Sequence, residues 1–309
     1  MKPSPDEERV APPSSALDLI GGTPLVRIAR ISGGLNPKVR VYAKLERGNP
    51  GGSVKDRAAS RMIQDAEQAG LLTRDKTILD STSGNTGIAY AMIGAIKGYR
   101  VRIVIPENAS VERKKIMAGF GAELVFSSPF EGADGAIRLA KEILSKNPGR
   151  YFQPDQYNNP SNPRAHELTT GPEIIAQTNG TITHFVACVG TGGTIMGTGR
   201  ALKAFNPAIR ILSVHPDDAM HGIEGSKYLE EGAIVPSIFD MSFPDKRLTV
   251  GTEAAFDITK RLAREEGLFV GTSSGAALSA ALTVAEWLDE GTIVVMFPDG
   301  GERYLSREL

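Results

Sequence analysis

One stretch constrains this chain more than any other: Asn49-Pro50-Gly51-Gly52-Ser53-Val54-Lys55-Asp56-Arg57. Its proline and glycines predict a turn, and Ser53 with Asp56 three residues later is similar to a capping box at a helix start. Lys55 would then lie just inside a helix N-terminus. Roughly half a positive elementary charge at that end disfavours a second cation and lowers the pKa of the ammonium group. An amine that is partly uncharged near neutral pH suits Schiff-base chemistry.

The alternative for Lys55 is an ordinary solvated lysine on a helix surface, which describes most lysines in proteins. The Gly-rich turn in front of Lys55 and the three loops described below favour the chemical role instead. We therefore treat Lys55 as a candidate catalytic residue.

Length and composition limit the class of protein. The 309 residues suggest two domains of about 150 residues each. A net charge of −1 argues against nucleic acid or an anionic membrane as the main partner. We find no apolar run long enough to span a bilayer and no signal sequence in the Pro-rich, charged start, so we expect a flexible tail over 1–16 and a cytoplasmic protein. The single cysteine, Cys188, excludes an internal disulfide and suits a reducing compartment.

Hydrophobic periods of strands and helices alternate along the chain, which predicts an α/β fold with two doubly wound, mostly parallel sheets. The predicted strands cover 39–45, 77–80, 101–105, 122–126, 151–153, 183–189, 209–214, 268–270 and 292–297. The predicted helices follow Lys55 to Gly70 and then cover 88–97, 111–119, 131–145, 172–177, a segment ending at 205, 252–266 and 276–288. The segment 217–250 is the least periodic, and we expect loops with short elements there.

Three strand-to-helix turns share small and hydroxyl residues, at 82–87, 190–194 and 271–275. In this kind of fold, ligands bind beyond the carboxyl ends of the strands, where such turns lie. The turn at 190–194 reads Gly-Thr-Gly-Gly-Thr and predicts an anion cradle, because its glycines allow close backbone approach and its N–H groups start a helix. A purely structural tight turn is equally compatible with that composition. The turn around Asn85 would suit a carboxylate.

The turn at 271–275 contains Gly271, Ser273 and Gly275 in the spacing of a hydrolase nucleophile elbow. A hydrolase of that class needs an acid and then a histidine after the serine. None of the four histidines follows Ser273, so this alternative is weak. We expect His184 and Cys188 to be core residues, and the run from Arg113 to Lys115 to be a solvated helix face.

The lysine stretch, followed by Thr-Ser-Gly-Asn-Thr-Gly and then Gly-Thr-Gly-Gly-Thr, resembles the cysteine synthase family, that is, the O-acetylserine sulfhydrylases. These are pyridoxal-phosphate enzymes of fold type II, related in fold to the tryptophan synthase β chain. The resemblance extends over about 17–306. The segment from Pro106 to Arg113 is more similar to the cysteine synthase B branch. Gly22 is a departure, because the family usually has asparagine there.

The resemblance implies a role for each of these motifs. Lys55 would form the Schiff base with pyridoxal 5′-phosphate, Asn85 would bond the ring hydroxyl, and Ser273 would bond the pyridine nitrogen. The phosphate would be held by Gly190, Thr191, Gly192, Gly193 and Thr194. The substrate carboxylate would be held by Thr82, Ser83, Thr86 and Gln156.

The resemblance also implies an organisation of the chain. A larger cofactor-binding domain would comprise 17–48 and 160–309, and a smaller mobile domain, 49–159, would close on it. Family members are usually homodimers that act on small molecules, and no metal site, nucleic acid or membrane is expected.

The implied reaction replaces the β-substituent of an O-activated serine, either O-acetylserine or O-phosphoserine, with sulfur to give L-cysteine. Lys55 would remove and return the α-proton. Sulfide, thiosulfate and a protein thiocarboxylate all remain open as the sulfur donor, and Lys227 is a candidate for recognising a phosphate. The alternatives are a cystathionine β-synthase-like condensation with homocysteine and a non-catalytic phosphate-binding module.

Overall fold

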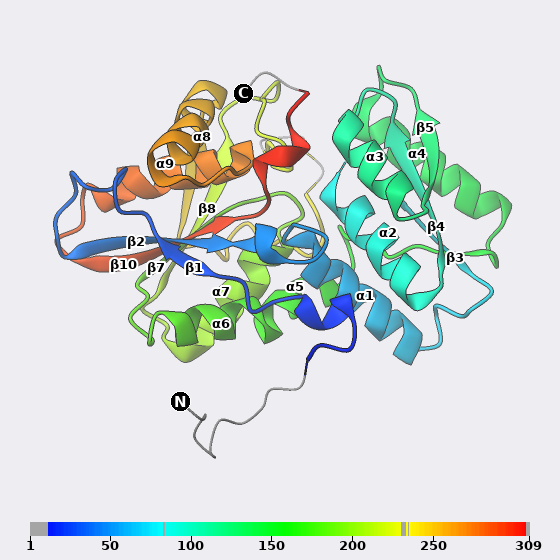
Figure 1. Cartoon of the computed structure of the whole chain (residues 1–309), viewed down its shortest axis with the longest axis horizontal. Helices are drawn as coiled ribbons and strands as arrows, with labels where there is room; N and C mark the ends of the chain where they lie inside the picture. The colour runs from blue at the N-terminus through cyan, green and yellow to red at the C-terminus, as the bar shows by residue number, and fades with distance from the viewer. Residues whose placement is uncertain (1–11, 83, 230–232, 234, 307–309) are drawn as a thin grey trace, which may run out of the picture.

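The computed structural model describes residues 12–82, 84–229, 233 and 235–306, so most of the expected N-terminal tail lies outside the described residues. Two sheets, each covered by helices on both faces, form the two halves of the molecule (Figure 1). The α/β class predicted from the alternating periods is confirmed.

The larger sheet has the strand order β1-β2-β10-β7-β8-β9 and is parallel except for β1 against β2. Its strands are β1 (Leu25–Arg27), β2 (Val39–Leu45), β7 (His184–Cys188), β8 (Arg210–Pro216), β9 (Lys246–Val250) and β10 (Gly291–Phe297). Its helices are α5 (Ser161–Leu168), α6 (Thr170–Gln177), α7 (Gly193–Phe205), α8 (Thr252–Glu266) and α9 (Thr272–Ala285). One core joins the sheet to α8 and α9, and a second joins its other face to α6 and α7.

The smaller sheet has the order β5-β4-β3-β6 and is parallel throughout. Its strands are β3 (Thr77–Ser81), β4 (Arg100–Pro106), β5 (Glu123–Ser127) and β6 (Tyr151–Phe152). Its helices are α2 (Asn85–Lys97), α3 (Val111–Gly119) and α4 (Gly132–Lys146). We call these elements, residues 77–152, the smaller half. Helix α1 (Lys55–Gln68) packs on α2 of the smaller half and on α5 of the larger half.

Several local expectations were wrong. Val270 forms only an isolated bridge with Gly300 rather than a strand over 268–270. Strand β9 is a short element within the segment 217–250, as expected there, although its position was not predicted, and α5 was missed because a proline and polar residues obscure its helical pattern. The three short 3₁₀ helices η1 (Ala16–Leu19), η2 (Glu46–Gly48) and η3 (Gly301–Arg303) were also missed. Within the described residues, no helix is both long and apolar enough to cross a membrane.

Asp80 is an acid in the middle of β3 and only 3% exposed. Burial raises its pKa to about 7, although the N–H of Ser81 bonds its carboxylate. The folded state therefore holds a proton that the unfolded chain releases near pH 4, so stability falls as the pH rises from about 4 to about 7.

The variant Asp80→Asn should accordingly be more stable than the unmodified protein at pH 8, by on the order of 2–3 kcal/mol. The difference between the two pKa values of Asp80 corresponds to ~4 kcal/mol at pH 8. The gain in the variant should be smaller, because the asparagine amide cannot form every hydrogen bond of the protonated acid. Urea unfolding at pH 8 and pH 5 checks this, since the gain should shrink at pH 5. An equal gain at both pH values would contradict the titration argument.

Candidate active site

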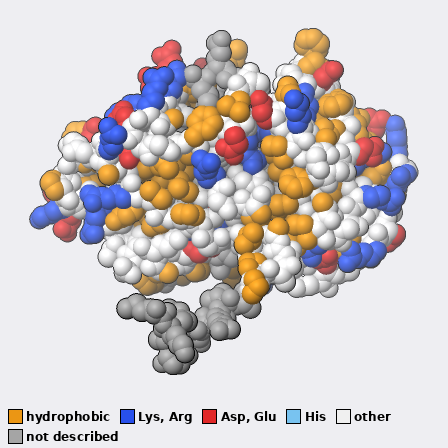
Figure 2. Space-filling view, viewed as in Figure 1, with side chains coloured by type: hydrophobic (Ala, Val, Ile, Leu, Met, Phe, Trp, Pro, Cys, Tyr) orange, Lys and Arg blue, Asp and Glu red, His pale blue; other side chains and the backbone are white. Residues whose placement is uncertain are grey.

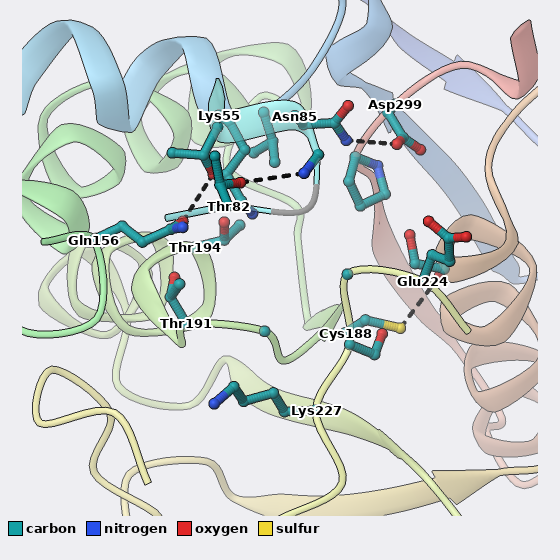
Figure 3. A pocket seen from close by; sticks show the side chains of 18 of the residues that line it. Lys55, Thr82, Asn85, Gln156, Cys188, Thr191, Thr194, Glu224, Lys227 and Asp299 are labelled. Atoms are coloured by element: carbon teal, nitrogen blue, oxygen red, sulfur yellow. Dashed lines mark hydrogen bonds between the residues drawn. The ribbon is translucent and has the colours of Figure 1, made fainter. Parts of the chain in front are cut away.

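A cavity of about 240 Å³ lies where the carboxyl ends of the two sheets face each other. Its walls come from α1, from the turns after β3, β7 and β10, and from the start of α9 (Figure 3). Among the residues expected at the site, the cavity is lined by Lys55, Thr82, Asn85, Thr86, Gln156, Gly190, Thr191, Gly192, Thr194 and Ser273. Segments that are far apart in the sequence therefore meet here as predicted.

Lys55 is the first residue of α1 and points into the cavity. The turn before it is held to β10, because the N–H of Val54 donates to the carbonyl of Pro298 at 2.8 Å. Gly52 has φ +76°, and a Cβ there would lie 2.2 Å from Nη2 of Arg303, so this position needs glycine. The turn thus has one shape that aims Lys55 at the cavity.

The pKa of Lys55 is lowered, in the predicted direction, but the cause differs from our expectation. Burial is the dominant cause, and the nearby charge of Asp299 opposes it. The expected capping box is absent: α1 has no side-chain cap, and Ser53 Oγ accepts only the N–H of Lys55, at 3.3 Å. Asp56 instead accepts the N–H of Gly51 at 2.6 Å and so braces the glycine turn.

The turn after β7 has the shape of an anion cradle at the start of α7. Gly192 has φ +85°, and a Cβ there would lie 2.5 Å from Phe239, so glycine is required. Thr191 Oγ1 accepts from Asn162 Nδ2 at 3.1 Å, and Thr194 Oγ1 lies 3.3 Å from His166 Nε2. Gly193 is outside the cavity wall and packs against Asn162 instead. The sequence had not indicated Asn162 or His166.

The turn after β3 brings polar groups to the opposite wall. Thr86 Oγ1 donates to Gln156 Oε1 at 2.8 Å, and the N–H of Gly84 donates to Thr82 Oγ1 at 3.2 Å (Figure 3). The bond from Thr86 to Oε1 holds the Gln156 amide in the wall of the cavity and leaves its NH₂ group to act as a donor. Ser83, the remaining residue expected to hold a carboxylate, lies outside the described residues.

Asn85 begins α2 between two residues from the C-terminal segment. Its Nδ2 donates to Asp299 Oδ2 at 2.6 Å, and Arg303 Nη1 donates to its Oδ1 at 2.7 Å. Tyr304 also donates to Asp299 Oδ2, at 2.6 Å. We missed this group, although Asp299 lies two residues after the predicted strand 292–297, where site residues of this fold lie.

Ser273 is the second residue of α9, is 5% exposed and lines the cavity. Within the described part of the chain, the histidines make their hydrogen bonds to groups other than Ser273. The geometry therefore gives the hydrolase alternative no general base. Cys188 packs against the core of the larger sheet, as expected, and it also lines the cavity. Burial raises the pKa of its thiol to about 12.

Arg113 corrects a further expectation, because it is 4% exposed and lines the cavity rather than facing solvent. It forms an ion pair with Glu224. The signal that we overlooked is Met117, one helical turn later, which lies on the same buried face of α3. Lys227 also reaches the cavity wall, with Nζ 4.7 Å from the ring centroid of Tyr157.

These groups fit a phosphorylated aldehyde cofactor. One wall offers a helix N-terminus with two threonine hydroxyls for a phosphate, another offers an amine whose pKa burial lowers, and Ser273 and Asn85 supply neutral polar groups. The cavity and the donor chemistry thus match pyridoxal 5′-phosphate.

Comparison with known proteins gives the same result. Residues 16–299 match the family model described as pyridoxal-phosphate dependent enzyme. A cysteine synthase from Aquifex aeolicus is 51% identical over 298 residues, which span 95% of this chain and 91% of that protein. The chain therefore belongs to the pyridoxal-phosphate dependent enzymes and, within them, to the cysteine synthase family.

Solved structures agree with this assignment. A cysteine synthase from Entamoeba histolytica is 37% identical with a TM-score of 0.91, over 99% of this chain and 92% of that one. An O-acetylserine dependent cystathionine β-synthase from Helicobacter pylori is also 37% identical, with a TM-score of 0.90, over 97% of this chain and 99% of that one. The fold predicted from the resemblance is confirmed.

Proposed function

We propose that the protein makes L-cysteine by replacing the β-substituent of an O-activated L-serine with sulfur, using pyridoxal 5′-phosphate. The observation that carries the proposal is a single cavity in which Lys55 faces both the cradle at Gly190 to Thr194 and the turn around Asn85. The cysteine synthases among the relatives of this chain support the same reaction.

When bound, pyridoxal 5′-phosphate supplies an aldehyde carbon that joins to amines and a ring that withdraws electrons from the α-carbon of the donor. The backbone and hydroxyls of Gly190 to Thr194 would hold the phosphate end, and Ser273 and Asn85 would bond the ring. Ser273 offers a neutral hydroxyl, which withdraws fewer electrons through the ring nitrogen than a charged partner would. That choice favours prompt loss of the β-substituent.

Different residues of this chain bind the donor and move its α-proton. Thr82 and Gln156 would bind its carboxylate, with Thr86 holding the Gln156 amide in place, and so fix the direction of its Cα–H bond. Lys55 Nζ takes the α-proton, and burial, which lowers the pKa of this amine, favours the uncharged form that can do so. After sulfur has bonded to the β-carbon, the same Nζ returns the proton to the α-carbon. The walls of the cavity keep water from the reacting carbon in between.

The test is direct. Protein supplied with pyridoxal 5′-phosphate is mixed with O-acetyl-L-serine or O-phospho-L-serine, and then with sulfide, thiosulfate or homocysteine. We expect the visible absorbance to change on addition of the donor alone and cysteine to form when sulfide follows. A colourless protein that binds phosphate without turnover would instead indicate the non-catalytic module. Preference for homocysteine would indicate the cystathionine β-synthase reaction, which the Helicobacter pylori neighbour makes a specific alternative.

Lys227 bears on the choice of donor, because a cation on the cavity wall favours a phosphate leaving group. We expect Lys227→Gln to raise the KM for O-phosphoserine about 10-fold or more and to change the KM for O-acetylserine less than about 3-fold, since one charge pair corresponds to about 1–3 kcal/mol. Steady-state kinetics with both donors measures this, with the exposed Lys115→Gln as control. Equal effects on the KM of both donors would show that Lys227 does not recognise the phosphate of O-phosphoserine.

Two further features of the resemblance belong to this proposal. The smaller domain, 49–159, would close on the larger one when the donor carboxylate binds, and two chains would form a homodimer. Exposed hydrophobic side chains such as Trp287 and Phe130, and the groups of hydrophobic side chains over both halves in Figure 2, support association with another chain. Light scattering of the purified protein would measure its mass.

A further inference from the structure

Arg113 is a buried cation that the mechanism above does not use. It is the third residue of α3 in the smaller half, and the start of α3 is tied to the C-terminal segment. The N–H of Ser306 donates to Glu112 Oε1 at 2.8 Å, and Ser110 Oγ donates to the carbonyl of Arg303 at 3.0 Å. The helix thus holds the side chain of Arg113 at one place in the cavity wall.

Glu224, Tyr304 and Gly84 lie close to the guanidinium of Arg113. Nη1 donates to Glu224 Oε2, and Cζ lies 4.7 Å from the ring centroid of Tyr304. A Cβ built at Gly84 would lie 3.1 Å from Cζ and 3.2 Å from Nε, so the flat group lies directly against the backbone of Gly84. Gly84 belongs to the turn between Thr82 and Thr86 that we assign to the donor carboxylate.

Glu224 belongs to the larger half of the molecule. Its backbone N–H donates to Thr272 Oγ1 at 3.3 Å, at the start of α9, and the N–H of Gly222 donates to Thr252 Oγ1 at 3.0 Å, at the start of α8. The ion pair between Arg113 and Glu224 therefore joins the two halves across the cavity, beside the carboxylate turn.

We propose that Arg113 is a positioning residue of the donor site: held by Glu224 and by the ring of Tyr304, its guanidinium supports the backbone of Gly84 and so fixes the start of α2 beside the donor carboxylate. This inference rests on the proposed function. The carboxylate of Glu224 balances the charge of the guanidinium, so Arg113 acts through its position against Gly84 rather than through a direct attraction for the donor. Arginine suits the position better than lysine, since a planar group lies flat on Gly84 and on an aromatic ring while bonding a carboxylate.

The inference separates donor binding from cofactor binding. Lys55 and the cradle at Gly190 to Thr194 come from α1 and α7, and Asn85, the proposed cofactor contact in the turn beside Arg113, is held by its own bonds to Asp299 and Arg303. Loss of Arg113 should therefore weaken binding of the amino-acid donor and leave the cofactor and the sulfur donor almost unaffected.

The experiment compares Arg113→Met with Lys115→Met, which removes the same charge from an exposed position on the same helix. Donor is titrated alone into the cofactor-loaded proteins, and the absorbance change gives its half-saturation. We expect Arg113→Met to raise that value about 10- to 100-fold, with the dissociation constant of pyridoxal 5′-phosphate and the KM for sulfide within about 2-fold. Lys115→Met should match the unmodified protein, and Arg113→Lys should lie between.

An unchanged donor half-saturation in Arg113→Met would overturn the inference, and so would an equal loss of cofactor affinity. If Arg113→Met does not fold, Glu224→Gln and Gly84→Ala change two of the groups that contact the guanidinium and leave Arg113 itself in place. Both should then raise the donor half-saturation, and normal values in both would also overturn it. Failure of the proposed function is distinguishable, because the unmodified protein would then show no response to any donor.

Discussion

Replacing Lys55 with alanine should abolish measurable cysteine formation, with a loss of at least about 10³-fold, because one amine both carries the cofactor and moves the α-proton. The variant should also lose the visible absorbance that borohydride removes from the unmodified protein. Lys55 has its Nζ in the cavity rather than in the core of either sheet, so the fold should persist. Absorbance spectra before and after borohydride, together with a cysteine assay, measure both effects.

The matched control is Lys38→Ala, an exposed lysine away from the cavity, which should leave both readouts unchanged. A small primary amine added to Lys55→Ala should restore part of the activity, since the missing function is a free amine. If Lys55→Ala kept a borohydride-sensitive chromophore, another amine would hold the cofactor and the assignment would fail.

The position of Lys55 could be predicted from the sequence because the features that define it are local. A proline, two glycines and a following helix lie within a few residues, and each limits the backbone directly. The direction of its pKa shift was predicted as well, but from the field of the helix. Burial proved to be the larger cause, and burial depends on Pro298 and Asp299, which are more than two hundred residues away. An argument from neighbouring residues in the sequence cannot predict burial by distant segments.

The groups that were missed share this non-local character. Asp299 and Arg303 hold the two ends of the Asn85 amide, and Arg113 bonds Glu224 across the cavity. A charged residue on a short helix is usually solvated, and only the pairing of distant segments reverses that expectation for Arg113. The one local signal was the buried spacing from Arg113 to Met117.

The secondary-structure predictions also succeeded where the signal was local and failed where it was not. The helix predicted over 111–119 was confirmed to the residue, because Ser110 caps it and Gly119 ends it. The position of strand β9 was not predicted because its residues are mostly charged or polar. It is held at the sheet edge by backbone pairing with β8 from Leu212 to Pro216. Pairing with a neighbouring strand thus makes these residues an edge strand, although their own hydrophobic pattern does not indicate one.

The second large effect concerns Arg57, two residues after Lys55. Its Nε and Nη2 donate to Glu46 at 2.7 and 2.9 Å, and its Nη1 donates to Glu173 at 2.6 Å. Although burial opposes it, bonding to Arg57 and Lys44 lowers the pKa of Glu173 to about 2. Glu46 is fully buried. Arg57→Met should therefore lower the free energy of unfolding by about 3–5 kcal/mol, because it leaves a buried carboxylate without its cation.

We expect the loss of stability in Arg57→Met to come from the unpaired Glu46 carboxylate rather than from the lost hydrogen bonds. A double variant can separate these two causes. Adding Glu46→Gln to Arg57→Met removes the unpaired charge, so the double variant should regain a large part of the loss in urea unfolding. Arg61→Met, one turn later, removes a partly exposed i,i+4 pair with Asp65 and should cost less than about 1 kcal/mol. If the double variant were as unstable as the sum of its parts, packing of the Arg57 side chain would be the cause. Because Arg57 joins α1 to η2 and α6, the same substitution should also weaken cofactor binding by loosening the helix that begins at Lys55.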